Sequence, residues 1–322
     1  MSTTVVGSAN LDLVYRVERI PSPGETVLAV SSDAVPGGKG NNQAVAAARA
    51  GAEVTFVVAL GRDAAGDRLA DEARASGVRV LDRRVDAATG TALITVDASG
   101  ENSIVVDSAA NAHLRDLTAE EREAVAAADV LLLQLETPLA TVTDAAALAR
   151  SAGTLVVLNA APVRTLPAAL LDAVDILVVN EHEAALLAPG TASAREAAMA
   201  LADDRRAVVL TLGGEGALVV VPGAEPAAIA AHRVDVVDTT GAGDTFCGAL
   251  AADLDRSGFV GVHADGAADG AANRRLRGAS ALDGLVAAAR FASAAGALAV
   301  QRAGAVPSIP TLEEIRELTD GR

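Results

Sequence analysis

The sequence has few aromatic residues, one cysteine and an excess of acidic side chains. Aromatic residues make up 2% of the 322 positions and tryptophan is absent, so a core must be built from Val, Leu, Ile and Ala. The single cysteine, Cys247, excludes an internal disulfide and fits a reducing compartment. A formal net charge of −16 argues against nucleic acid or an anionic membrane as the main partner. Any phosphate site must therefore be made by a few groups at one place, such as backbone amides, Lys39 and a metal ion, rather than by a broad basic surface.

The sequence also shows no pattern typical of a secretion signal or of a membrane-spanning segment. Residues 1–4 carry no charged side chain, and Val5-Val6 is too short for the hydrophobic region of a signal peptide. The longest apolar stretch, 285–300, is interrupted by Arg290 and is rich in Ala and Gly, which indicates a buried helix rather than a membrane span. We therefore expect a cytoplasmic protein with no membrane partner.

Short runs rich in β-branched residues alternate with helical stretches along most of the chain. The predicted strands are 4–6, 54–58, 130–133, 155–158, 176–179 and 208–212. The predicted helices include 42–50, 67–76, 139–151 and 194–202. Continuous apolar strands that alternate with helices predict an α/β fold, with a parallel sheet covered on both faces, in one domain over 1–322. Ligands of such folds bind beyond the carboxyl ends of the strands.

Three regions depart from this alternation. Segments at about 12–34 and 89–107 each read as two polar-alternating strands joined by a turn, which predicts a small separate sheet. Each segment leads back toward a candidate functional region, so we expect this sheet to act as a lid. Residues at about 256–284 are rich in Gly, Ala, Asp and Arg with little periodicity, which predicts a surface insertion.

A turn with two glycines, Gly241-Ala242-Gly243, lies between a strand-like segment at 233–237 and a helical run at 246–254. Its backbone N–H groups and the helix start favour an anion. Asp244 follows directly, where a carboxylate would repel a bound phosphate but could accept a proton from an attacking hydroxyl. One interpretation is phosphoryl transfer with Asp244 as base and the Gly241–Gly243 amides stabilising developing charge. The other is an Asp placed in the first turn for the helix dipole.

A second glycine-rich segment, 36–43, contains Lys39, the only lysine of the chain. A compact ammonium between glycines suits a phosphate, although a solvated loop lysine would look the same. The segment is not a P-loop, because Gly40 stands where Ser or Thr would bind the metal. Nor is either segment a dinucleotide fingerprint, because Gln43 and Phe246 occupy the positions of the third glycine. A nicotinamide oxidoreductase is therefore disfavoured.

Six short segments together resemble one known family, the PfkB carbohydrate kinases. They occur in the order 7–12, 37–43, 134–136, 180–183, 211–213 and 238–244, and each is weak alone. The resemblance covers nearly the whole chain. It implies a Rossmann-like, doubly wound, mainly parallel sheet with a small β-sheet lid. It also implies transfer of the γ-phosphoryl group of ATP to the 5-hydroxyl of D-ribose.

The resemblance assigns the sugar contacts residue by residue. The matching positions are Asn10, Asp12, Gly38, Lys39, Asn42 and Glu136, with Asp244 as the base. A carboxylate can accept hydrogen bonds from two vicinal hydroxyls, so Asp12 is expected to detect the 2- and 3-hydroxyls. Without the resemblance, Asp12 would read as a solvated carboxylate at a strand end. Glu136 would equally read as the acid at a helix N-terminus before Pro138.

The resemblance also assigns the nucleotide and cation contacts. Asn180 and Glu183 would organise Mg²⁺ and the phosphates of ATP, largely through water, although an acid cluster that caps a helix would have the same sequence. The positions that match the ATP contacts are Thr211, Gly213, Gly214, Gly216, Gly243 and Ser293. Residues 213–216 also read as a hairpin turn. A monovalent cation, usually K⁺, is implied at Asp238, Thr240, Ala299, Arg302, Gly304 and Ser308, mostly through main-chain carbonyls. A homodimer through the lid is implied as well.

Some positions depart from the family pattern, and alternatives to the implied reaction remain. Asn41 lies where Ala is common, and Ser293 lies where a larger polar residue often contacts the nucleotide. One alternative is a family member acting on deoxyribose, a ketohexose or a nucleoside, although few aromatic residues disfavour a site built on base stacking. Another is a non-catalytic sugar-binding protein with the same fold. The joint presence of Lys39, Glu183 and Asp244 argues against it, because binding alone needs no base.

Overall fold

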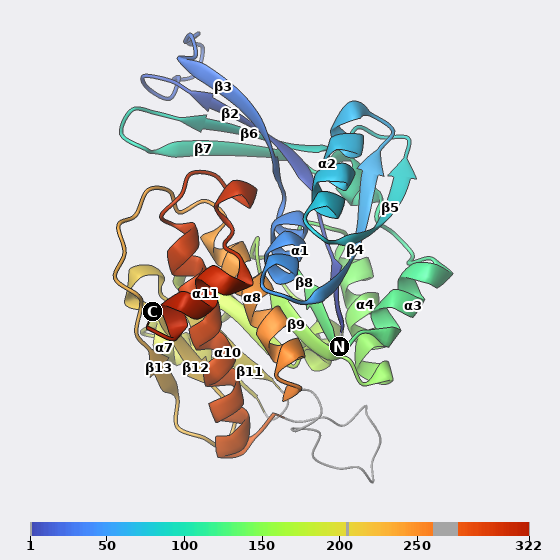
Figure 1. Ribbon diagram of the computed structural model, residues 1–322, viewed down its shortest axis with the longest axis vertical. Helices are drawn as coiled ribbons and strands as arrows, with labels where there is room; N and C mark the ends of the chain where they lie inside the picture. The colour runs from blue at the N-terminus through green and yellow to red at the C-terminus, as the bar shows by residue number, and fades with distance from the viewer. Residues whose placement is uncertain (1, 204–205, 260–275, 322) are drawn as a thin grey trace.

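The computed structural model describes residues 2–203, 206–259 and 276–321. A large sheet lies between two layers of helices, and a smaller sheet projects from one end of this body (Figure 1). The predicted α/β architecture is confirmed, as is the separate small sheet.

The large sheet has nine strands in the order β13-β12-β11-β10-β9-β8-β1-β4-β5. All neighbours are parallel except β11–β12 and β12–β13, which are antiparallel. The strands are β1 Ser2–Val6, β4 Glu53–Gly61, β5 Arg79–Val85, β8 Val130–Leu133, β9 Leu155–Asn159, β10 Ile176–Asn180, β11 Ala207–Thr211, β12 Ala217–Val220 and β13 Ala227–Ile229. The order reverses direction at β1, and such a switch point is where ligands of open α/β sheets bind.

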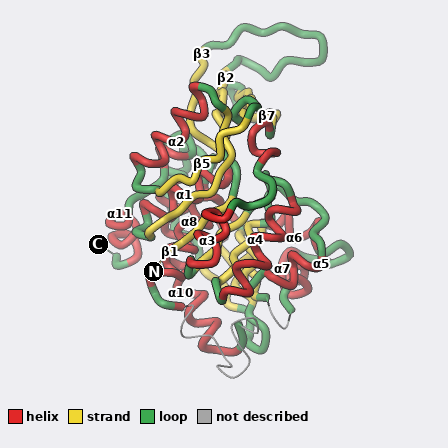
Figure 2. Tube along the Cα trace, turned by 90° about the vertical axis from the view of Figure 1, so that its right-hand side faces the viewer, coloured by secondary structure: helices red, strands yellow, loops and turns green. Residues whose placement is uncertain are grey.

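Two apolar cores hold the helices against the two faces of the sheet (Figure 2). One core packs α1 Lys39–Arg49, α2 Ala64–Ala75, α8 Ala242–Arg256, α10 Gly278–Ala299 and α11 Leu312–Thr319. The other packs α3 Ala119–Ala127, α4 Leu139–Ala152, α5 Ala168–Ala173, α6 Glu181–Leu187 and α7 Ala194–Leu201. By length and hydropathy α10 could span a membrane, but its Leu285 and Phe291 are buried in the first core, as expected for the apolar stretch that we predicted to be an internal helix.

The small sheet has the order β3-β2-β6-β7, and in Figure 1 it extends above the rest of the molecule. Its strands are β2 Asn10–Arg16, β3 Ser31–Gly37, β6 Gly90–Val96 and β7 Asn102–Asp107. Strand β2 pairs with β3 antiparallel and with β6 parallel, so the two predicted hairpin regions form one sheet. Because β2 begins at Asn10 and β3 ends at Gly37, this sheet joins the body directly at two of the predicted sugar segments. We refer to it below as the lid.

Three details differ from the sequence-based predictions. Residues 233–237 form no strand; they are irregular, with Val236 and Val237 exposed, and the Val237 N–H donates to the carbonyl of Val300. Their β-rich composition misled the prediction because no neighbouring strand is available to pair with them. Strand β5 was not predicted, since its charged residues mask the pattern. Helix α10 already begins at Gly278, inside the predicted insertion, and residues 260–275 of that insertion lie outside the described residues.

Candidate active site

The glycine turn before α8 places Asp244 in the first turn of that helix. Gly241 has φ +74°, and a Cβ there would lie 2.9 Å from the Cβ of Ala305, so the turn requires glycine. The Ala242 N–H already donates to the carbonyl of Thr239 (3.2 Å). The N–H groups of Gly241 and Gly243, at the helix start, have no intrahelical acceptor. Two of the three predicted amides are therefore placed to bind an anion beside Asp244.

Amide donors from α1 hold both oxygens of the Asp244 carboxylate, which is 8% exposed. The Asn42 Nδ2 donates to Oδ2 (3.0 Å), and the Gln43 Nε2 donates to Oδ1 (2.9 Å). Lys39 lies nearby at the start of α1, and the carboxylate of Asp244 raises its pKa against the opposing effect of burial. The ammonium of Lys39 is therefore charged near neutral pH, as a phosphate-binding role requires.

The predicted sugar residues of the lid converge at the point where β2 leaves the body. Asn10 is buried, and its Oδ1 accepts from the Nδ2 of Asn111 (2.8 Å). Asn111 also clamps the backbone of Ala9, accepting from its N–H (3.0 Å) and donating to its carbonyl (3.2 Å). A Cβ at Gly90 would lie 2.3 Å from both amide side chains. Asn10 is thus fixed in one orientation by a residue that the sequence did not indicate.

Asp12 is 8% exposed, and its Oδ1 has no hydrogen-bond partner within the described residues. Burial, and then the carboxylates of Glu136 and Asp244, raise the pKa of Asp12 from 3.8 to about 7. Gly37 pairs with Asn10 across β2 and β3, and a Cβ there would lie 2.0 Å from the Asp12 Oδ2, which explains the glycine at this position. A buried, unpaired carboxylate oxygen is an acceptor that requires a ligand donor.

Glu136 follows β8 and connects the turn at Ser8, after β1, with the turn at Lys39, after β3. Its Oε2 accepts from the hydroxyl of Ser8 and from the backbone N–H of Lys39 (3.1 Å). The turn at Gly38 has φ +85°, and a Cβ there would lie 2.7 Å from the N of Asn10. Glu136 is thus near the predicted sugar contacts, but its hydrogen bonds in the structure organise the backbone around them.

Asn180 and Glu183 form a capping box at the start of α6. The Asn180 Oδ1 accepts from the Glu183 N–H (2.8 Å), and the Glu183 Oε2 accepts from the Asn180 N–H (2.9 Å). The capping interpretation is therefore correct. It does not exclude that Asn180 and Glu183 also organise Mg²⁺ and the phosphates of ATP. Burial raises the pKa of Glu183, although the N–H of Asn180 and the ammonium of Lys39 oppose that rise.

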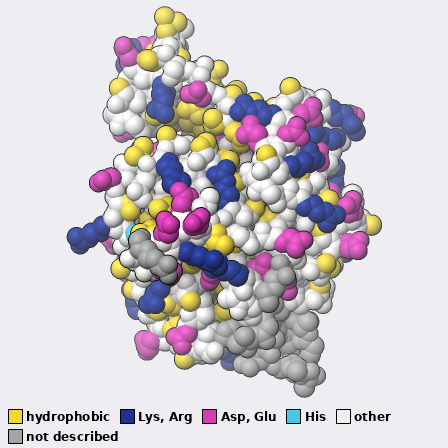
Figure 3. All heavy atoms as spheres, in the orientation of Figure 1, with side chains coloured by type: hydrophobic (Ala, Val, Ile, Leu, Met, Phe, Trp, Pro, Cys, Tyr) yellow, Lys and Arg dark blue, Asp and Glu magenta, His cyan; other side chains and the backbone are white. Residues whose placement is uncertain are grey.

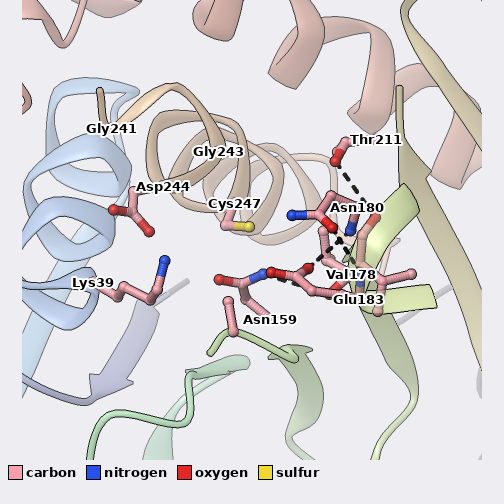
Figure 4. A pocket seen from close by; sticks show the side chains of 12 residues that line it. Lys39, Asn159, Val178, Asn180, Glu183, Thr211, Gly241, Gly243, Asp244 and Cys247 are labelled. Carbon is pink, nitrogen blue, oxygen red and sulfur yellow. Dashed lines mark hydrogen bonds between the residues drawn. The ribbon is translucent and has the colours of Figure 1, made fainter. Parts of the chain in front are cut away.

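A cavity of about 140 Å³ joins these groups at the carboxyl ends of the strands. Lys39 and Asp244 line one side, and Asn180, Glu183 and Thr211 line the other, as Figure 4 shows. Asn159, at the end of β9, points into the same space. Among the described residues no group of three or more His, Cys, Asp or Glu side chains could hold a metal. The oxygen ligands on offer suit a hydrated hard cation rather than a fully coordinated transition metal.

A second, larger pocket of about 440 Å³ adjoins the first and shares Thr211 and Gly243 with it. All the residues predicted to contact ATP in this region line it, namely Thr211, Gly213, Gly214, Gly216, Gly243 and Ser293. The remaining lining is mostly apolar and includes Phe246, Ala297 and Val300. Gly216 lies between β11 and β12, so the predicted hairpin turn is confirmed and also forms the pocket wall. Arg233, Val234 and Val236 also line this pocket.

The predicted cation residues lie on two loops that the Asp238 carboxylate holds together. Its Oδ2 accepts from the Gly304 N–H (2.8 Å) and its Oδ1 from the Thr240 N–H (2.9 Å). Burial raises the pKa of Asp238, but these hydrogen bonds outweigh burial and lower it below the usual value. The guanidinium of Arg302 pairs with Glu314 on α11. Ser308 is buried and donates to the carbonyl of Ala305 (2.8 Å), and Ala299 ends α10. Main-chain and hydroxyl oxygens of this kind fit a monovalent cation.

Comparison with known proteins confirms the family that the six sequence segments indicated. Residues 2–312 match the pfkB family of carbohydrate kinases. A ribokinase from Haemophilus influenzae is 38% identical over 325 residues, which cover 98% of this chain and 98% of the relative. A ribokinase structure from Thermotoga maritima is similar with a TM-score of 0.83 at 31% identity, covering 99% of each chain. A structure of Arabidopsis thaliana ribokinase complexed with ribose and ATP gives a TM-score of 0.83 at 32% identity over 98% of each chain.

Proposed function

This chain belongs to the pfkB family of carbohydrate kinases, and we propose that its cleft transfers the γ-phosphoryl group of ATP to the 5-hydroxyl of D-ribose. It is a phosphotransferase that acts on an alcohol group, and its substrates are a small sugar and ATP. One observation supports the site assignment most. Asp244 is buried beside a glycine turn, between the lid residues and the glycine-lined pocket.

In the proposed reaction the 5-hydroxyl oxygen attacks the γ-phosphorus, and Asp244 accepts the hydroxyl proton. A bond forms between that oxygen and phosphorus, while the bond from phosphorus to the β–γ bridging oxygen breaks and ADP leaves. The N–H groups of Gly241 and Gly243 stabilise the negative charge on the transferring group. Lys39 adds a fixed positive charge on the same side of the cavity.

The proposed sugar contacts are the buried polar groups below the lid. Asp12 accepts from the 2- and 3-hydroxyls, and Asn42 offers a buried Oδ1 that has no partner within the described part of the chain. The Oδ1 of Asn10 accepts from Asn111, and its Nδ2 group is proposed to donate to the same sugar. Asn42 also donates to Asp244, so it would couple sugar position to base position.

We assign the phosphates and their Mg²⁺ to the cavity between Asp244 and Glu183. Mg²⁺ neutralises phosphate charge during transfer, and Asn180 and Glu183 would hold it through water because their oxygens already cap α6. The adenine and ribose of ATP are assigned to the larger pocket. Its apolar lining favours a planar base, and the small Ser293 leaves room there.

A monovalent cation at the Asp238 loop would order the backbone that bears the Gly241 and Gly243 amides. Potassium is the ion we assign, through carbonyls near Thr240, Ala299 and Gly304. Exchange of K⁺ for tetramethylammonium, at constant ionic strength, should lower kcat severalfold. Equal rates with both ions would remove this assignment and leave the reaction itself intact.

Association into a homodimer through the lid, in the cytoplasm, completes the proposal. Large apolar side chains are exposed on the lid: Tyr15, Leu93, Ile104, Val105 and Val106. Apolar side chains are visible on the lid at the upper left of Figure 3. Such exposure on a small sheet favours an interaction surface.

The direct test identifies the product. The protein is incubated with ATP, Mg²⁺, K⁺ and D-ribose, and the product is analysed by phosphorus NMR for coupling to the C5 protons. Ribose 5-phosphate and ADP in equal amounts are expected. Ribose binding without any phosphorylated product would favour a non-catalytic sugar-binding protein instead.

A further inference from the structure

Gln43 directly follows Asn42, the last predicted sugar contact of its segment, on α1, and is completely buried. Its Nε2 donates to the Oδ1 of Asp244 (2.9 Å) and to the Oδ1 of Asn159 (3.1 Å). Its Oε1 accepts from the Nε2 of Gln134 (2.7 Å). Both N–H groups and the carbonyl oxygen of this side chain are thus hydrogen-bonded, and its contact with Asp244 spans 201 positions of sequence.

This amide can have only one orientation. If it were flipped, its oxygen would face the Asp244 carboxylate and the Asn159 oxygen, and its nitrogen would face the NH₂ of Gln134. Each of these contacts would pair two acceptors or two donors. The network therefore fixes which atom Gln43 presents to Asp244.

The backbone around Gln43 fixes its distance from Asp244 as well. Gly248 lies one turn after Asp244 on α8, and a Cβ there would lie 2.5 Å from both the carbonyl oxygen of Gln43 and the Cβ of Ala46. Helices α1 and α8 therefore touch at this glycine. Gln134 follows β8 and Asn159 ends β9, so the amide is anchored to the sheet on its other side.

We propose that Gln43 is the positioning residue of the base, an inference that rests on the proposed phosphoryl transfer. Gln43 does not touch the sugar, because it has no exposed surface. Its hydrogen bond restrains rotation of the Asp244 carboxylate, so that an unshared lone pair points at the 5-hydroxyl when the sugar binds. Asn42 holds the other carboxylate oxygen, but its own Oδ1, which has no partner within the described residues, is assigned to the sugar in the proposed function.

The first test is Gln43→Met, which keeps the length of the side chain and removes the amide. We expect kcat to fall about 10- to 100-fold, the effect of a reacting group displaced by about an ångström. The dissociation constants of ribose and of an unreactive ATP analogue, measured by calorimetry, should stay within roughly threefold, which is less than 1 kcal/mol.

Thr154→Val is the matched control for lost stability. Thr154 is also buried and donates to the carbonyl of Ala128 (2.8 Å), but it precedes β9 at the end of the sheet opposite to Asn159. This variant should have a lower Tm with an unchanged kcat. If Gln43→Met lowers Tm by a similar amount, the difference in kcat between the two variants isolates the positioning effect.

A second variant, Gln43→Glu, changes charge with little change of shape. A second carboxyl group beside Asp244 shares a proton with it, so the acidic limb of the kcat profile, measured at saturating ribose to remove the titration of Asp12, should move to higher pH by at least about one unit. The charged groups that already face Asp244, namely Lys39, Glu183 and Asp12, are the same in the wild type and in Gln43→Glu. This profile decides the question if Gln43→Met does not fold.

The outcomes separate this proposal from the proposed function. A folded Gln43→Met protein with wild-type kcat, or a Gln43→Glu protein with an unmoved acidic limb, would overturn the role of Gln43. So would a loss of kcat that is matched by an equal loss of ribose affinity. By contrast, a wild-type protein that does not turn over ribose would overturn the proposed function itself.

Discussion

The two sides of the cleft are built from different kinds of residue. Below the lid, the side chains are buried and polar, and the Asp12 Oδ1 and Asn42 Oδ1 have no partner within the described residues. The nucleotide pocket is instead lined by glycines and by apolar residues such as Phe246 and Val300. Unpaired buried acceptors cost free energy in the empty protein and regain it when hydroxyls bind. In the proposed site, we therefore expect the sugar side to select by hydrogen bonding and the nucleotide side to select by shape.

The largest effect is expected at Asp244, where the two sides meet. Asp244→Asn should lower kcat by at least ~10³-fold, because the variant cannot accept the hydroxyl proton. Ribose affinity should fall much less than kcat, although the Nδ2 of the asparagine would face an amide donor of Asn42 or Gln43. Asp253→Asn is the control on the same helix, where the carboxylate pairs with Arg256 away from the cavity. Turnover retained in Asp244→Asn would remove this residue from the mechanism.

On the sugar side, Asp12→Asn should lower kcat/KM for ribose by at least ~10²-fold, since the acceptor for two hydroxyls is lost. The KM for ATP should stay within about threefold, because Asp12 does not line the nucleotide pocket. Asp33→Asn, an exposed position on β3 of the same lid, is the control and should behave like the wild type. If Asp12→Asn raised the KM for ribose and the KM for ATP equally, the sugar side and the nucleotide side would not bind their substrates independently.

On the nucleotide side, Gly216→Ala should raise the KM for ATP about tenfold, since a tightened pocket wall is expected to cost roughly 1.4 kcal/mol of binding. Gly216 has φ +101°, and a Cβ there would lie 1.9 Å from the carbonyl oxygen of Ile229, so the turn must deform. Gly190→Ala, at φ +92° in open space, has the same backbone strain without the clash. Ribose affinity, measured by calorimetry, should be unchanged in both variants.

The smallest effect concerns pH and again separates the two sides. The pKa of Asp12 is raised to about 7 by burial and by its neighbouring carboxylates, so this group gains a proton as the pH falls through neutrality. The ionised form is the better acceptor for hydroxyls. Ribose affinity should therefore fall about fourfold from pH 8 to pH 6.5, while the affinity for an ATP analogue should not follow it. Asp12→Asn should have no such dependence; a dependence that persists in the variant would assign the titration to another group.

The sequence predicted the parts of the site that local pattern determines. The apolar strands, the glycine turns at Gly38 and Gly241, and the acid directly after the second turn all follow from spacing and residue type. The lid was predictable because its strands alternate between polar and apolar residues. The wrong strand at 233–237 shows the limit of such patterns, since β-rich composition does not supply a neighbouring strand.

The polar network around the site could not be predicted in the same way. Asn111 contacts Asn10 across 101 positions, and Gln43 contacts Asn159 across 116, so no local spacing connects them. Buried amides at such positions look like ordinary helix or loop residues in the sequence. Only the fold reveals that they fix the orientation of the predicted groups.

In the proposed site, the sugar side detects a vicinal diol while Asp244 activates the 5-hydroxyl. The most direct measurement is ADP formation from ATP with Mg²⁺ and K⁺ present, using D-ribose, 2-deoxyribose, fructose and adenosine as acceptors. We expect kcat/KM for ribose to exceed that for 2-deoxyribose by at least ~10²-fold, with the other two acceptors weaker than ribose. Equal use of ribose and 2-deoxyribose, or a clear preference for another acceptor, would contradict it.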